Sequence, residues 1–151
     1  MAANAKIVLD SDARGEQILP IDQNFFLGYR KTVIEADQIL KAIIVPFTKP
    51  NSYFEAYKQA QRREDDIAIV TGAFYLELDK ENIVDVCRIS YGGMAPVTKL
   101  ALKTMEQLKG KKWDKRILEV ALNSLNDEMK LPSNVPGGMA QYRLTLAKSF
   151  F

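Results

Sequence analysis

The sequence predicts an α+β fold, an antiparallel β-sheet covered on one face by three C-terminal helices. Three observations support this prediction. Short segments of alternating apolar and polar residues fill residues 6–93, helical spacing of apolar residues begins after residue 96, and strands and helices do not alternate. Strands followed by helices, without β-α-β units, are typical of such an α+β sandwich. With 151 residues and 47% hydrophobic content, the chain is expected to form a single domain, 1–151.

The first predicted strands form a hairpin. Residues 6–12 and 16–21 both alternate apolar and polar side chains, and Gly15 lies between them, a pattern typical of two antiparallel strands joined by a tight turn. Residues 39–47 are rich in β-branched side chains, and we expect this strand to end at Pro46, which has no backbone N–H to donate.

Between these strands, residues 22–32 are predicted to contain a helical turn. Asp22 is the residue type that caps a helix N-terminus, and Gly28 is the type that ends a helix. Three later segments have the strand pattern again: residues 53–60, 67–78 and 83–93. Gly72 is expected to mark a bulge or close packing, and Gly92 with Gly93 a break that needs positive φ or a close backbone approach.

Three amphipathic helices are predicted after Pro96. Apolar residues recur at helical spacing in residues 97–108, 114–129 and 139–150. Gly110 is expected to end the first helix, Asp114 to begin the second and Pro132 to end it. We expect these apolar stripes to form the core against the sheet.

The composition excludes several classes of function. The formal net charge of +2 is far from the basic excess of a dedicated nucleic-acid-binding protein. The sequence has neither a transmembrane run of about 18 apolar residues nor a signal-peptide pattern, so we expect a cytoplasmic protein that binds no membrane. Cys87 is the only cysteine and there is no histidine, which excludes cysteine-cluster and histidine-ligated metal sites and histidine-dependent nucleophilic catalysis. We expect no catalytic residue and no metal ligand here.

One segment concentrates opposing charges. Arg62 and Arg63 are followed directly by Glu64, Asp65 and Asp66, at the beginning of an apolar strand. From the charges alone, a solvent-exposed corner with ion pairs and a charged surface that faces a ligand are both consistent with the sequence.

Four segments carry a resemblance to a known family: FFLGYRKT (25–32), YFEAYKQAQRREDDIAIV (53–70), ISYGGMA (89–95) and PGGMAQYRLTLAKSFF (136–151). In this order and with nearly this spacing, they resemble the C-terminal part of the flavin domain of xanthine dehydrogenase/oxidase, a molybdo-flavoenzyme family. The equivalent lobe in the wider family is the carbon monoxide dehydrogenase flavoprotein C-terminal domain. The resemblance covers essentially the whole chain and implies that the chain is a fragment of a longer oxidoreductase of purine catabolism.

The resemblance also implies cofactors and partners. The parent enzyme hydroxylates a purine or related heterocycle at a molybdopterin centre and passes electrons through iron-sulfur clusters to FAD, which reduces NAD or oxygen. Molybdopterin and the clusters are bound elsewhere in the parent, a homodimer, and FAD is shared with a preceding lobe. By resemblance, Leu40 packs against the flavin ring system and Lys58 makes a polar contact to it. The isolated chain is expected to fold but to be inactive and to hold FAD weakly.

Residues 59–69, which we call the charged turn, match a mobile loop beside the flavin. By resemblance, Arg62 and Asp65 exchange places as the enzyme switches between dehydrogenase and oxidase forms, Arg63 joins an aromatic cluster that anchors the switch, and Asp66 belongs to the same loop. Positive charge near a reduced, anionic flavin stabilises it and negative charge destabilises it. The exchange is therefore expected to change the redox preference and the approach of anionic NAD.

Two alternatives remain beside this interpretation. In the aldehyde oxidases, which resemble this family and use oxygen, the acidic residues after the arginine are largely neutral, whereas Glu64, Asp65 and Asp66 are acidic here. The second alternative is an interaction module with the same fold and no redox role. Ile69 stands where some animal members carry a lysine, which alters the charge balance of the charged turn.

Overall fold

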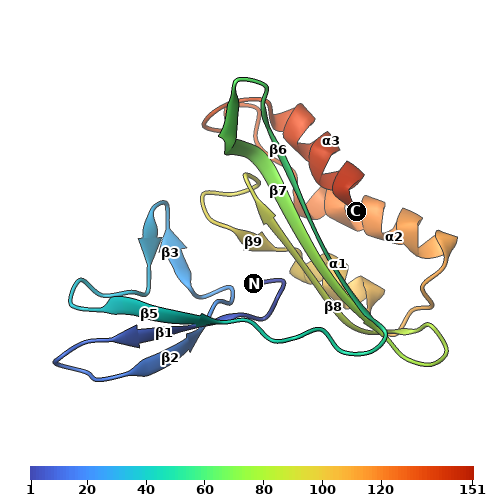
Figure 1. Cartoon of the computed structure of the whole chain (residues 1–151). Coiled ribbons are helices and arrows are strands. Elements are labelled where there is room, and N and C mark those ends of the chain that lie inside the picture. Colours follow the sequence, from blue (N-terminus) through green and yellow to red (C-terminus); the bar gives the residue numbers. More distant parts are fainter.

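The computed structural model describes residues 1–63 and 67–151 in full and residues 64–66 as backbone only. Its strands and helices confirm the predicted α+β class (Figure 1). The strands are β1 (Lys6–Asp10), β2 (Gln17–Pro20), β3 (Phe26–Gly28), β4 (Lys31–Thr32), β5 (Ile39–Ile44), β6 (Ser52–Gln61), β7 (Glu64–Leu78), β8 (Val84–Gly92) and β9 (Lys99–Leu100). The helices are α1 (Leu102–Leu108), α2 (Lys115–Glu128) and α3 (Ala140–Phe150).

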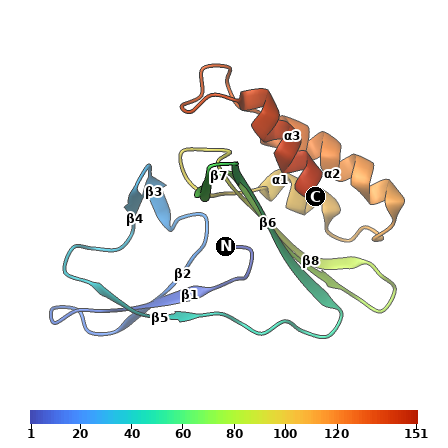
Figure 2. The same cartoon turned by 45° about the horizontal axis from the view of Figure 1, so that its top comes forward.

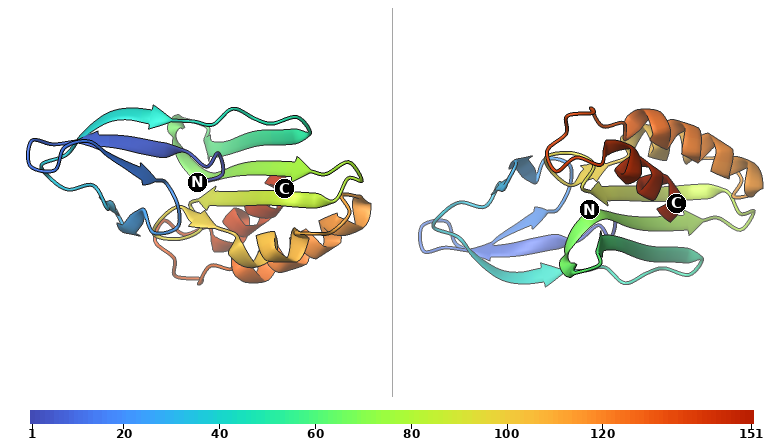
Figure 3. Two further views of the ribbon diagram at one scale, coloured as in Figure 1. Left: turned by 90° about the horizontal axis from the view of Figure 1, so that it is seen from below. Right: turned by 90° about the horizontal axis from the view of Figure 1, so that it is seen from above.

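The strands form three antiparallel sheets. The largest has the strand order β6-β7-β8-β9, and we call it the main sheet. The three helices cover one face of it, as predicted (Figure 3). The first five strands form two further sheets, in the orders β2-β1-β5 and β3-β4. These N-terminal sheets lie beside the main sheet, and the connection of residues 45–51 joins β5 to β6 (Figure 2).

The buried apolar residues fall into two clusters that follow the sheets. The larger cluster lies between the main sheet and the helices and includes Val70, Ile89 and Leu125. The smaller cluster belongs to the N-terminal sheets and consists of Ile7, Leu9 and Phe25, with partly buried neighbours around them. Most of the clustered buried apolar residues therefore lie on the helix-covered side of the main sheet.

The helical turn predicted within residues 22–32 is wrong. The Asp22 carboxylate accepts a hydrogen bond from the Asn24 N–H (2.8 Å), and the Phe25 N–H donates to the Asp22 carbonyl (3.2 Å). The chain then continues into the β3-β4 pair. An aspartate that bonds to the backbone two residues ahead makes a tight turn, a local structure that competes with a helix.

The first helix begins later than predicted. Lys99 and Leu100 form β9, which pairs with Tyr91 and Ser90 of β8, so that α1 starts only at Leu102. A short edge strand cannot be distinguished from the first turn of a helix by the spacing of its apolar residues, because both contain only a few positions.

A residue from another helix caps the N-terminus of α1. The residue at the N-cap position, Ala101, has no side-chain acceptor. Instead, the Glu128 carboxylate at the end of α2 accepts from the backbone N–H groups of Lys103 (3.0 Å) and Thr104 (2.9 Å). Lys99 donates to the Glu128 carbonyl (2.9 Å). These bonds satisfy donors at the start of α1 and tie it to α2.

Two predictions about single residues are confirmed. Asp114 is the N-cap of α2, and its carboxylate accepts from the Arg116 N–H (2.9 Å). Gly72 is a position of close packing, because an added Cβ would lie 3.0 Å from Phe74 Cε2 and 3.2 Å from Phe150 Cδ2. Helix α3 can approach the main sheet closely at this glycine.

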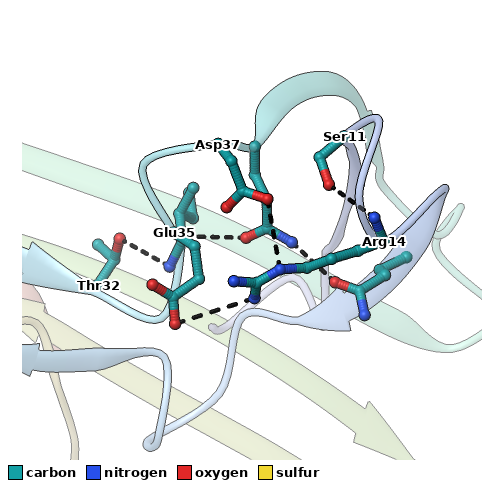
Figure 4. Close-up of polar contacts among 8 residues, drawn as sticks. Ser11, Arg14, Thr32, Glu35 and Asp37 are labelled. Atoms are coloured by element: carbon teal, nitrogen blue, oxygen red, sulfur yellow. Dashed lines mark hydrogen bonds and ion pairs between the residues drawn. The ribbon is translucent and has the colours of Figure 1, made fainter.

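Polar contacts hold the tip of the first hairpin against the segment that precedes β5 (Figure 4). The Arg14 guanidinium lies 3.4 Å from Asp37 Oδ2 and 4.0 Å from Glu35 Oε1, and the Arg14 N–H donates to Ser11 Oγ (3.1 Å). Exposed ion pairs contribute little to stability. Here they join the tip of the first hairpin to the segment before β5.

Candidate functional site

The candidate site lies on the face of the main sheet opposite the helices. The strand register places side chains of this face in rows across β6, β7 and β8. The first row is Lys58, Thr71 and Gly92, and the second is Ala56, Ala73 and Ser90. A cavity of about 270 Å³ is lined by residues of both rows. Apart from Lys58 the side chains are small, so the sheet presents a flat floor, which we call the small-residue floor.

In the first row, Gly92 leaves the space that the Thr71 side chain occupies. A Cβ added at Gly92 would clash with the Thr71 hydroxyl, which lies across that position. Lys58 pairs with Thr71 from the other side, and its side chain is exposed at the edge of the small-residue floor. The floor is thus bordered on one side by a flexible cation with three N–H donors.

The third row forms a bulkier boundary. It consists of Phe54, Tyr75 and Arg88. The Arg88 guanidinium carbon lies 4.1 Å from the centre of the Tyr75 ring, and Arg88 Nε donates to the Ala2 carbonyl (2.7 Å). Arg88 therefore links the main sheet to the segment that leads into β1, while stacking on an aromatic ring.

Leu40 lies on β5 next to an irregularity in the strand pairing. Leu9 pairs with Leu40, whereas Val8 pairs with Ala42, so that Lys41 is an extra residue on β5. A bulge of this kind changes the direction of neighbouring side chains. Leu40 is 49% exposed. An apolar side chain held at this exposure on a strand is available for contact with another group.

Lys41 itself is held by two carboxylates. Its Nζ lies 2.6 Å from Glu16 Oε2 and 3.6 Å from Asp10 Oδ2. The hydrogen bond to Glu16, followed by Coulomb attraction to both carboxylates, raises the pKa of Lys41 above its ordinary value. These contacts direct the lysine toward the first hairpin.

The structure places the predicted flavin contacts on different sheets, Leu40 on β5 and Lys58 on β6 (Figure 2). Lys58 and Arg62, four residues apart in the sequence, both border an open hollow of about 390 Å³ along residues 58–62. Arg62 and Arg63 lie in the turn between β6 and β7 and are exposed. The side chains of Asp65 and Asp66 lie outside the described part of the structure.

The strand pairing is irregular where the charged turn begins. The register of β6 against β7 shifts on both sides of Ala60, and Gln59 Nε2 donates to the Ala60 carbonyl (2.8 Å). Irregular pairing weakens the ladder that holds a hairpin. The charged turn is therefore attached less regularly than the rest of the β6-β7 pair.

Sequence reasoning missed the partners of Lys58 on the small-residue floor. Thr71 and Ala73 lie on the predicted strand of residues 67–78, where alternation puts them on one face. Ser90 lies on β8 opposite Ala73. Alternation gives the face of each strand, but the row that residues share depends on the register, which the sequence does not supply.

The described residues supply neither a metal cluster nor a reactive thiol. Outside the side chains of residues 64–66, no group of three or more histidine, cysteine, aspartate or glutamate residues is arranged to hold a metal ion. Burial raises the pKa of the Cys87 thiol to about 12, so it remains protonated at neutral pH. In the same described part, no helix has the length and apolar character needed to cross a membrane.

The arrangement is suited to a flat, electron-rich ligand. Small side chains leave room for a planar ring above the sheet, Lys58 offers charged donors at its edge, and Arg62 adds positive charge from the turn. Such a set binds and orients a ring and influences its electrostatics. None of these groups is placed as an activated nucleophile or a metal ligand.

Comparisons with known proteins show the family and the fold of the chain. Residues 55–151 match the family described as CO dehydrogenase flavoprotein C-terminal domain. Over the whole chain, the sequence is 45% identical to xanthine dehydrogenase/oxidase from Gallus gallus and 44% identical to xanthine dehydrogenase from Blastobotrys adeninivorans. It is 43% identical, over 90% of its length, to nicotinate hydroxylase hnxS from Emericella nidulans. The chain spans 11% of the length of the first two relatives and 10% of the third.

Solved structures show the same fold. Carbon monoxide dehydrogenase from Hydrogenophaga pseudoflava superposes with a TM-score of 0.83 at 24% identity, and quinoline 2-oxidoreductase from Pseudomonas putida 86 with a TM-score of 0.76 at 24% identity. Each match covers 98% of this chain and 50% of the chain compared. At this level of identity the likeness concerns the fold alone.

Proposed function

This chain belongs to the CO dehydrogenase flavoprotein C-terminal domain family, and we propose that it works as part of a longer xanthine dehydrogenase-like oxidoreductase. In this proposal it supports the FAD site and supplies the charged turn that tunes electron transfer to NAD or oxygen. The observation that carries the proposal is the small-residue floor with Lys58 at its edge.

The residues of the floor fit a flavin. Ala56, Ala73 and Ser90 form a row without large side chains, and a planar ring can approach such a surface closely. Lys58 donates hydrogen bonds to polar atoms at the edge of the ring, and Leu40 packs against it from the N-terminal sheets. When bound, FAD takes up electrons within the parent enzyme and passes them to NAD or oxygen.

The charged turn acts through electrostatics. Arg62 next to the site favours negative charge on the ring, whereas Asp65 in the same place disfavours it, so that the reduced ring gives up its electrons more readily; both charges also change the field that anionic NAD meets. Arg63 anchors the turn, and Asp66 adds to its negative charge. The irregular pairing around Ala60 supports a turn that adopts more than one arrangement.

The parent enzyme supplies everything else. We place molybdopterin, the iron-sulfur clusters and the first FAD-binding lobe in other parts of the polypeptide, and the enzyme as a cytoplasmic homodimer. The exposed apolar surface of this chain supports the proposal, because all six residues of β5 are exposed and Phe47 is 99% exposed. Such surface is typical of a contact with further protein. The isolated chain folds, has no activity of its own and holds FAD weakly.

The first test is the spectrum of the native protein. An antibody to residues 1–151 captures the protein from its source, and its mass and visible absorption are recorded. We expect a chain several times longer, with overlapping flavin and iron-sulfur absorption that bleaches on addition of xanthine. A colourless native protein of 151 residues would contradict the proposal and favour an interaction module.

The role of the charged turn has its own test. In the full-length enzyme, Asp65→Ala should weaken reduction of NAD more than oxidation of xanthine with an artificial electron acceptor, because only the first reaction needs NAD beside the flavin. Equal loss of both activities would show that Asp65 serves the structure and not the choice of acceptor.

A further inference from the structure

The structure assigns a positioning role to Arg143 of α3: it holds the loop at Gly93 against the beginning of β7 and thereby sets the position of the charged turn. This inference rests on the proposed function, since the charged turn matters only beside a flavin. It connects one glycine of each glycine pair, Gly93 and Gly137, to a single side chain.

The Arg143 guanidinium bridges two loops that are distant in the sequence. Its Nη1 donates to the Gly93 carbonyl (3.2 Å), in the loop after β8, and its Nη2 donates to the Pro136 carbonyl (3.2 Å), in the loop before α3. The planar guanidinium can donate in two directions at once. Arg143 therefore fixes the loop after β8 relative to the helix layer.

Gly93 transmits this contact to the strand that leaves the charged turn. Its φ is +81°, and an added Cβ would clash with the Ile69 carbonyl oxygen and lie 3.3 Å from Val70 Cα. The backbone of the loop thus rests directly on β7 at Ile69, the last residue of the charged turn. Only glycine permits both the backbone conformation and the close approach.

The second loop is shaped around the arginine. Gly137 has a φ of +79°, and an added Cβ would lie 2.5 Å from Arg143 Nη2. A larger residue at this position would displace the guanidinium from the Pro136 carbonyl. Gly137 thus leaves room for the guanidinium between the Gly93 and Pro136 carbonyls.

One atom of Arg143 makes its position energetically unfavourable. Its Nε is buried and has no hydrogen-bond partner among the described residues. A buried donor without a partner destabilises the folded state, and an apolar side chain would avoid this penalty. A contribution to stability alone does not account for an arginine here, whereas the need to hold the Gly93 and Pro136 carbonyls does.

The consequence concerns one end of the charged turn. At its β6 end the strand pairing is irregular around Ala60, whereas at its β7 end the Gly93 backbone lies against Ile69. Without Arg143, the loop after β8 loses its tie to α3 and the turn gains freedom at its β7 end. In a less restrained turn, the fraction of time that Arg62 and the acidic residues each spend near the flavin changes.

The test compares Arg143→Ala with Arg116→Ala in the full-length protein. Both variants lose one arginine, and Arg116 lies exposed at the start of α2. Amide hydrogen exchange is measured over residues 59–70. We expect Arg143→Ala to accelerate exchange there about fivefold, the effect of one or two lost hydrogen bonds, and Arg116→Ala to leave it unchanged. The ratio of NAD to oxygen reduction should fall in Arg143→Ala, and Arg143→Lys should lie between this variant and the wild type.

The outcomes separate this inference from the proposed function. Faster exchange confined to residues 59–70, in a protein that carries no flavin and reduces neither NAD nor oxygen, would retain the positioning role of Arg143 and overturn the proposed function. Unchanged exchange in Arg143→Ala, or a uniform increase over the whole chain, would overturn the positioning role. Faster local exchange with an unchanged NAD to oxygen ratio would also overturn it, because the turn would then move without effect on the acceptor.

Discussion

The two faces of the main sheet are built from the same strands and differ in almost every property. On the helix-covered face, the ring of Tyr57 stacks on Phe150 with a centroid distance of 5.7 Å, and Phe74 meets Tyr91 edge to face at 5.7 Å. On the opposite face, the neighbouring positions carry alanine, serine and glycine. Alternation along a strand thus allows one face to provide stability and the other to remain free for a ligand.

The difference predicts that substitutions on the two faces have separate effects. Changes to buried residues of the helix-covered face should lower the stability of the chain, and changes on the small-residue floor should lower flavin binding with little effect on stability. The following predictions are ordered by the expected effect on the folded state, from the largest to the smallest.

The largest effect is expected in the core beneath the helix-covered face. Leu125 on α2 is fully buried, and Leu125→Ala should lower the free energy of unfolding by about 2–5 kcal/mol, because it removes apolar contacts and leaves a cavity. Leu118→Ala on the same helix is the control, since Leu118 is 45% exposed. Urea unfolding of residues 1–151 measures both. Equal effects of the two substitutions would mean that the helices do not pack on the sheet as described.

The second effect concerns access of water to the helix-covered face. Burial raises the pKa of Cys87 to about 12 from 9.0. The folded state thus favours the neutral thiol, a preference that is complete below pH 9 and is lost as the pH rises from 9 toward 12. At pH 8 a thiol reagent should label the folded chain about a hundredfold more slowly than the urea-unfolded chain. Similar rates would show that water reaches this face.

A smaller loss of stability is expected where α2 caps α1. Glu128→Gln removes the carboxylate that accepts from the Lys103 and Thr104 N–H groups. It should reduce the free energy of unfolding by about 1–2 kcal/mol, the usual effect of losing a helix cap. Glu119→Gln is the matched control, because Glu119 is exposed on the same helix. If both variants unfold at the same urea concentration, the cap does not stabilise α1.

The sequence predicted the helix-covered face better than the small-residue floor. Local signals were sufficient for α2, where Asp114 supplies the cap. They failed where long-range pairing decides the structure. Lys99 and Leu100 form a strand because β8 lies beside them, and Asp22 closes a turn that leads into β3. Local preferences cannot anticipate such tertiary contacts.

The candidate site shows the same limit. The resemblance named Leu40 and Lys58, but only the strand register brings Thr71, Ser90 and Gly92 beside Lys58. The hydrogen bond from Arg143 to the Gly93 carbonyl is also invisible in the sequence, because the two residues are 50 positions apart. Motifs identify residues, whereas the rows and contacts they form depend on the folded chain.

The most direct test of the account places a large side chain on the small-residue floor. Ala56→Leu adds bulk there, and Glu55→Leu adds it to the other face of the same strand. Both changes are on an exposed strand and should alter stability by less than about 0.5 kcal/mol. The flavin absorbance per protein of the full-length enzyme is the measurement. The account predicts that Ala56→Leu loses most of its flavin and Glu55→Leu retains it; full flavin content in Ala56→Leu would contradict the claim that this face holds the cofactor.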